Sequence, residues 1–383
     1  MNDSNPSRAS RKRTAVLWLS IAAAATLGAL VAMPRGEDAP VTPPPSVPAP
    51  PRAPPPPPSS SAPADAGAPE VPYAVPDAGT LEAQREALFT NLANVHRLDA
   101  SQLERVRAIF EASDDDWLSQ GNPEKSEHPL TRDECLARRK SAEKLAPADA
   151  TCGAPHMVPL YDPKAGENPE LATTCIDQFE FPNIPCEYPV VWVRANEAAD
   201  LCSAVGKRLC DAHEWEGGCA GALRPIEQEY AFGQRRLMME HLHNKEREIV
   251  WAYGTKSDLT KCATGSNKSP KCFASEGFGV CGTNDYPAGS FPECVSPLGV
   301  YDQHGNVAEH MNLPLKPDEL ASRGGLGETE MKGSWFVFQR GQVHPDDCRW
   351  RALAWHAGKI RDRQSHRNYH LGFRCCRDKT PSP

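Results

Sequence analysis

Cysteine is the residue type in this sequence with the most chemistry to offer. The 383 residues include 14 cysteines, all of them between Cys135 and Cys376. Cysteines that hold zinc or an iron–sulfur cluster commonly come in C-x-x-C pairs, but no such pair occurs here, and Cys375 and Cys376 are adjacent. An even number of cysteines without metal-ligand spacing favours disulfides, which persist in an oxidising compartment.

Histidine is concentrated in the last third of the chain, at His304, His310, His344, His356, His366 and His370. The last two have the i,i+4 spacing that can place two imidazoles on one face of a helix. A zinc-protease helix of this kind also needs a glutamate inside the motif, and none stands between these two histidines. We therefore interpret the six histidines as surface residues.

The segment that carries these residues, 151–378, is expected to form one folded domain. It combines short helices with short strand-like runs, turn residues, glycines and aromatics, and it lacks the regular strand–helix alternation of a parallel sheet. This composition predicts an α+β fold.

Two helices are expected early in this domain. Asn196 should cap the first, because asparagine is a favoured N-cap, and Gly206 should end it, because glycine is favoured just past a helix. Asp211 and Glu214 have the spacing of a capping box and should start the second helix, which we expect to close at Gly217–Gly218.

The preceding segment, 80–150, is expected to contain a helical hairpin followed by irregular chain. Apolar residues recur at helical spacing over Thr80–Ser113, and Ser101 and Glu104 form an S-x-x-E signal for the start of the second helix. The polar, turn-rich stretch 114–150 shows no such pattern.

The N-terminal 79 residues are expected to export the chain from the cytoplasm and anchor it in the membrane. A basic tail, 1–13, precedes the uncharged run Thr14–Met33, which is about long enough to span a bilayer and carries its basic flank on the cytoplasmic side. A cleaved signal peptide is the competing interpretation. Residues 34–79 are rich in proline, which predicts a disordered, extended linker. The expected location is a single-pass inner-membrane protein with its C-terminal domain in the periplasm.

The charge balance argues against a nucleic-acid partner. The chain has 42 Lys plus Arg against 50 Asp plus Glu, a net charge of −8, whereas affinity for a phosphate backbone needs clustered positive charge.

Several segments, in order, resemble the formylglycine-generating enzyme (sulfatase-modifying factor) family. They are Cys175–Glu180, "CIDQFE"; Val190–Glu216, which contains "GKRLCDAHEWE"; Tyr301–His310, "YDQHGNVAEH"; Lys332–Trp335, "KGSW"; and Leu371–Cys375, "LGFRC". The resemblance implies a variant of the C-type lectin fold, with little regular structure and long ordered loops.

The resemblance also implies an oxidase, but this sequence departs from the family at the reactive position. Active members use two cysteines after "GGSW" to bind copper, since two soft thiolates suit Cu(I). Here Val337 holds the first of these positions, and Cys348 is the only cysteine nearby. The departure argues against copper and against oxidase activity.

Other site residues are carried over from the family. The resemblance implies a disulfide between Cys202 and Cys375. It also implies one from Cys219 to a cysteine after the Arg-x-Arg motif, where Ala352 stands and Cys348 is the nearest substitute.

A calcium ion is implied at the Gly-Asn loop. Asp302 and Glu309 would supply carboxylates and Gly305 and Val307 would supply carbonyls, which are hard oxygen ligands of the kind that Ca²⁺ prefers. The alternative is a turn with solvated carboxylates.

Two functions remain open at this point. The first is a membrane-anchored, exported binding or scaffolding module that presents its loops to a peptide, a glycan or an envelope protein. The second is an oxidative protein-maturation enzyme with an altered metal arrangement. The missing cysteine pair favours the first, because function depends on the site and not on the fold.

Overall fold

The computed structural model describes residues 79–113, 117–142, 147–269, 272, 281–352 and 358–379. The expected basic tail and membrane anchor, and all but the last residue of the expected linker, lie outside these residues. No helix within the described ranges is both long and apolar enough to cross a bilayer.

The expected helical hairpin is present as α1, Leu81–His96, and α2, Ala100–Ala112. The predicted capping box is wrong by two residues. Asp99, not Ser101, caps α2, and Gln102 reaches back to the backbone of Asp99. Asp99 is the cap because Arg97 alone, in the left-handed conformation, turns the chain after α1. The backbone of Asp99 is then already extended, as an N-cap requires.

The segment expected to be irregular contains a helix, α3, Arg132–Ser141. Its start is a capping box in which Thr131 and Glu134 bond each other's backbone N–H groups. Only Cys135 of this helix is buried, and it is joined to Cys186 by a disulfide. The helix lacks an apolar stripe, so its periodicity gave no signal.

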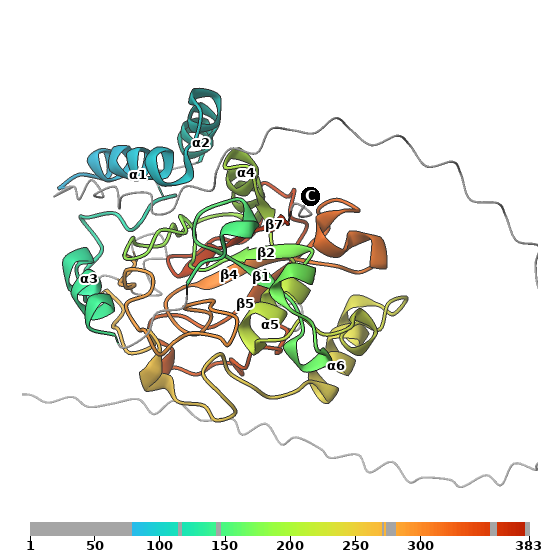
Figure 1. Ribbon diagram of the computed structural model, residues 1–383. Helices are drawn as coiled ribbons and strands as arrows, with labels where there is room; N and C mark the ends of the chain where they lie inside the picture. Colours follow the sequence, from blue (N-terminus) through green and yellow to red (C-terminus); the bar gives the residue numbers. More distant parts are fainter. Residues whose placement is uncertain are drawn as a thin grey trace, which may run out of the picture. The chain divides into compact units, whose positions relative to one another are not determined.

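The domain is built around two small sheets (Figure 1). The first is antiparallel, with strand order β1-β2-β7-β3, and the second has the order β5-β4-β6, in which β4 and β6 are parallel. The strands are β1 Met157–Leu160, β2 Thr174–Asp177, β3 Arg208–Leu209, β4 Ala308–Leu313, β5 Glu328–Lys332, β6 Leu371–Phe373 and β7 Cys375–Asp378. This mixture of helices and sheets agrees with the α+β prediction.

The two expected helices of the domain are α4, Ala195–Ala204, and α5, Ala212–Ala220. Asn196 is not the cap of α4, because the N-cap lies two residues earlier, at Arg194, whose N–H donates a hydrogen bond to Glu197 at 2.7 Å. Asp211 caps α5 as expected. That helix runs through Gly217–Gly218 and ends at Gly221.

A further helix, α6, spans Arg236–Glu246. Short 3-10 helices lie at Ala150–Cys152, Pro163–Ala165, Pro169–Leu171, Ile226–Gln228, Leu259–Lys261, Pro317–Ser322 and Phe338–Arg340.

All 14 cysteines form disulfides, so the structure has no free thiol. The seven pairs are Cys135–Cys186, Cys152–Cys175, Cys202–Cys375, Cys210–Cys376, Cys219–Cys348, Cys262–Cys294 and Cys272–Cys281. Both pairs implied by the family resemblance are among them. The adjacent Cys375 and Cys376 therefore cross-link β7 to α4 and to Cys210, which follows β3.

The largest apolar cluster joins the hairpin to the domain. Leu88 and Leu92 of α1 and Val106 and Phe110 of α2 are buried together with the apolar face of α4, including Leu201. Because α2 lies against α4 (Figure 1), the hairpin is packed onto the domain by apolar burial.

Candidate functional site

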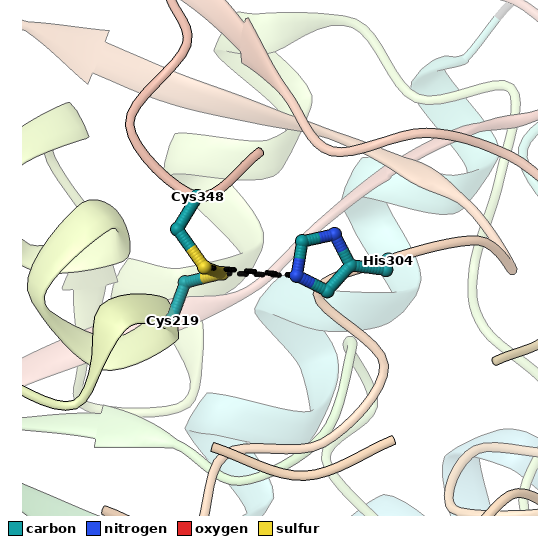
Figure 2. Close-up of side chains that lie close together, drawn as sticks. All are labelled: Cys219, His304 and Cys348. Carbon is teal, nitrogen blue, oxygen red and sulfur yellow. Dashed lines mark hydrogen bonds between the residues drawn. A yellow bond between two sulfur atoms is a disulfide. The ribbon is translucent and has the colours of Figure 1, made fainter. Parts of the chain in front are cut away.

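The disulfide Cys219–Cys348 lies against a buried histidine (Figure 2). Cys219 belongs to α5, Cys348 to the loop before the Arg-x-Arg motif, and His304 to the Gly-Asn loop. The Nε2 atom of His304 is 3.3 Å from the Sγ of Cys219 and 3.6 Å from the Sγ of Cys348. Three segments that are distant in the sequence therefore meet at one point.

The proton of His304 can be placed from its contacts. Its Nε2 accepts a hydrogen bond from the N–H of Ala252 at 3.0 Å, so a neutral ring carries its hydrogen on Nδ1. Burial lowers the pKa of His304, although nearby Asp346 opposes this. The Nδ1 atom is 4.0 Å from Asp346. The ring is therefore neutral and packs against the disulfide.

This trio is one of two groups of possible metal ligands within the described ranges. The other is Cys210, Glu214 and Cys376. Each group contains a disulfide, whose uncharged sulfurs are poor metal ligands compared with thiolates. With their cysteines oxidised to disulfides, both groups have a structural role.

The interpretation of the six histidines as surface residues is wrong for two of them. His304 and His310 are fully buried. The Nε2 atom of His310 lies 3.1 Å from the carbonyl oxygen of Val193. A buried histidine is tolerated when the backbone supplies a partner, and the sequence pattern carried no signal of those partners. His366 is exposed, and the segment around it and His370 is not helical.

The position of the family's first copper cysteine holds a buried apolar residue. Val337 packs with Trp192, Phe336 and Tyr369, and Cys348 is bonded to Cys219. A copper ion held by two thiolates needs two free cysteines. The residues present do not fit that ion.

An aromatic cluster lies beside Val337. Trp335 is stacked on His370, with ring centroids 4.9 Å apart, and is 5.6 Å from His344, which is itself stacked on Trp350 at 4.5 Å. Two imidazoles therefore flank the tryptophan of the "KGSW" segment.

The Gly-Asn loop is a tight turn that is held by contacts with Ala263 and Glu180. Gly305 and Asn306 both have positive φ, 76° and 51°. A Cβ on Gly305 would come within 2.5 Å of the carbonyl oxygen of Ala263, so only glycine fits. The side chain of Asn306 donates to Glu180 at 2.8 Å, and Glu180 also accepts from the N–H of Val307 at 3.1 Å.

The carboxylate of Glu309 is engaged inside the protein. Arg374 donates to both of its oxygens, at 2.6 and 2.7 Å, and the indole N–H of Trp215 donates to it at 2.9 Å. All three side chains are buried. A calcium ion at Asp302 and Glu309 stays a prediction, and it would have to share Glu309 with the guanidinium of Arg374.

The other two carboxyls of this cluster have raised pKa values. Burial raises the pKa of Asp302 to about 6, against the hydrogen bond that its side chain accepts from the N–H of Gly289. Burial also raises the pKa of Glu180 well above its ordinary value, and the negative charges of Asp302 and Glu309 add to this effect. Arg374 balances only one of the three carboxylates.

A second buried charge cluster was missed in the sequence. Glu216 at the end of "HEWE" binds Arg351 at 2.8 and 3.0 Å and Lys332 at 2.9 Å. Burial alone would raise the pKa of Glu216, but Arg351 and Lys332 outweigh it and hold that pKa low. All three residues belong to the family-like motifs, but the motifs did not predict that these side chains contact one another.

A family model supports the resemblance. The model of the sulfatase-modifying factor enzyme 1-like domain matches residues 166–379, which are 214 of the 383 residues. No curated protein matches the chain significantly. The matched segment includes α4, α5 and all the strands after β1, but it excludes the hairpin α1–α2 and α3. The chain therefore belongs to the sulfatase-modifying factor enzyme 1-like family.

Proposed function

We propose that this chain is an exported, membrane-anchored binding module whose domain has kept the family's lectin-like frame and lost its oxidase chemistry. The observation that carries the proposal is the state of Cys348. It is bonded to Cys219, and Val337 stands where the family's first copper cysteine would be. Activation of oxygen on a two-thiolate copper site needs both sulfurs as free ligands.

Export is supported by the disulfides. Seven disulfides in one chain are typical of a protein that folds in an oxidising compartment. The basic tail before the apolar run Thr14–Met33 would place the domain on the periplasmic side of an inner membrane. A peptide, a glycan or another envelope protein would be the partner.

An enzyme with a different metal arrangement is the second candidate. His344 and His370 flank Trp335, next to the family's reactive position. Imidazole nitrogens are good ligands for copper, iron and zinc, so either histidine could contribute to an altered oxidative site.

An oxidation assay separates the two candidates. The full-length chain is supplied with copper and then given a cysteine peptide and oxygen, and the peptide is analysed by mass spectrometry while oxygen uptake is recorded. The proposal expects no conversion of the cysteine. Conversion that is lost in a His344→Ala/His370→Ala variant would establish the enzyme instead. The matched control is His366→Ala, an exposed histidine outside the aromatic cluster.

A further inference from the structure

A groove lies between the added hairpin and the family domain. It has a volume of about 870 Å³ and is lined by α2, by α4 and by the segment 361–364. Arg105 and Ile109 contribute from α2, and Asn196 and Asp200 from α4. Because α2 lies outside the matched segment, this groove exists only through the hairpin.

The charges of the groove are uneven. Four arginines line it, against two acids, in a chain whose net charge is negative. Arg361 pairs with Asp200 at 2.6 Å, and Arg194 lies 3.6 Å from Glu197. In the described part of the chain, the exposed Arg105 and Arg363 form no ion pair. Two positive charges are therefore open to a ligand.

A third feature points to a main-chain donor. The Oδ1 atom of Asn196 is buried at the groove and has no hydrogen-bond partner within the described residues. Leaving a buried acceptor unpaired costs about 1–3 kcal/mol, so a turn of this side chain that brings Oδ1 to a ligand N–H would be favoured. The apolar wall beside it, formed by Ala108, Ile109 and Ala112, can take an uncharged side chain.

We propose that this groove binds an extended peptide carrying two acidic side chains separated by apolar ones. The two unpaired arginines take the carboxylates, and Asn196 accepts a main-chain N–H. A polyanionic polysaccharide fits less well, because Asp200 and Glu197 interrupt the positive charge and the α2 wall is apolar. The inference rests on the proposed function, since it names a partner class for a binding module, but its test measures binding and not oxidation.

The test uses fluorescence anisotropy with the full-length chain and labelled peptides of alternating glutamate and valine. A matched peptide of glutamine and valine has the same shape without the charge. The glutamate peptide should bind at low salt, weaken as salt is added, and bind more tightly than the glutamine peptide.

Variants then locate the binding. Arg105→Ala/Arg363→Ala should weaken the glutamate peptide about tenfold, since two exposed charge pairs together contribute up to about 1.4 kcal/mol. Asn196→Ala should weaken it several-fold without changing the salt dependence. The control Arg323→Ala/Arg340→Ala removes two exposed arginines outside the groove and should bind like the wild type.

Three results would overturn the proposal. The first is equal loss of binding in the groove variant and the control variant, which would mean non-specific charge attraction. The second is no binding of the glutamate peptide at low salt. The third is displacement of the peptide by polygalacturonate at lower concentrations than by unlabelled peptide, which would identify an acidic glycan as the partner.

Discussion

The family domain and the added hairpin are held in place by different forces. Five of the seven disulfides lie wholly within the family domain, the other two tie Cys135 and Cys152 to it, and the domain encloses charged groups such as Glu309 with Arg374. The hairpin lies N-terminal to Cys135, the first cysteine, so no disulfide reaches it. It is held by apolar contacts such as those of Val106 and Phe110 with α4, and by hydrogen bonds such as the buried one that Asn91 donates to Glu187 at 3.0 Å.

This difference indicates which contacts of the molecule are lost most easily. Covalent links and buried ion pairs fix the domain, since removing one partner leaves a cavity or an unpaired charge. Apolar contacts on one helix face can be lost in small steps. The groove therefore has one wall, α4, that a disulfide links to β7, and one wall, α2, that carries no disulfide.

The largest effect is expected from the disulfide that closes the longest loop. Cys202→Ala/Cys375→Ala opens a link across 173 residues and should lower the free energy of unfolding by about 5 kcal/mol in the chain-entropy model. Removing Cys272–Cys281, which spans 9 residues, should cost about half as much. Urea titrations of the three proteins compare these values, and equal losses would mean that loop entropy is not the cause.

The next effect concerns the buried ion pair. Glu309→Gln leaves Arg374 buried without its countercharge and should cost roughly 3–5 kcal/mol, whereas Glu309→Gln/Arg374→Met removes both charges and should recover part of it. Urea titrations with and without calcium also test the predicted calcium site. A wild-type domain that is stabilised by Ca²⁺ but not by Mg²⁺, with the response lost in Glu309→Gln, would show that calcium uses Glu309.

A pH-dependent effect is expected at Asp302. Its folded pKa of about 6 exceeds the ordinary value of about 3.9, so the folded state holds this proton more tightly than the unfolded state. The stabilisation is complete below about pH 4 and is lost as the pH rises through 6.

The variant Asp302→Asn should flatten this slope and gain about 2–3 kcal/mol relative to wild type at pH 7, with little difference at pH 4. Stability curves between pH 4 and 8 measure it. A variant less stable than wild type at pH 7 would show that the ionised carboxylate is needed, as a calcium ligand would be.

The smallest effect is expected in the hairpin. Val106→Ala removes two buried methyl groups and should cost about 1.5 kcal/mol. The loss should appear as faster hydrogen exchange in α1 and α2, with the exchange of β4 and β7 unchanged. Ala108→Ser, on the exposed side of the same helix, is the control. Faster exchange throughout the domain would contradict the division into two separately held regions.

Local signals in the sequence predicted some elements and missed others. The hairpin followed from apolar periodicity and the start of α5 from Asp211. The helix α3 gave no periodic signal, because Cys135 is its only buried residue.

Contacts between distant segments were harder to foresee. The family resemblance implied two disulfide pairs, but spacing alone does not determine the connectivity of 14 cysteines. The partners of Glu309 and Glu216, and the burial of His304, depend on segments more than 50 residues away. No local pattern encodes such contacts.

The central claim is that Cys348 is structural and not a metal-binding or reactive thiol. Its most direct test is alkylation of the native and the denatured protein without reductant, followed by peptide mapping by mass spectrometry. The account predicts no alkylated cysteine in either sample and a linked peptide that contains Cys219 and Cys348. Recovery of Cys348 as an alkylated, unlinked peptide would contradict the account and would favour the second candidate, an enzyme with a different metal arrangement.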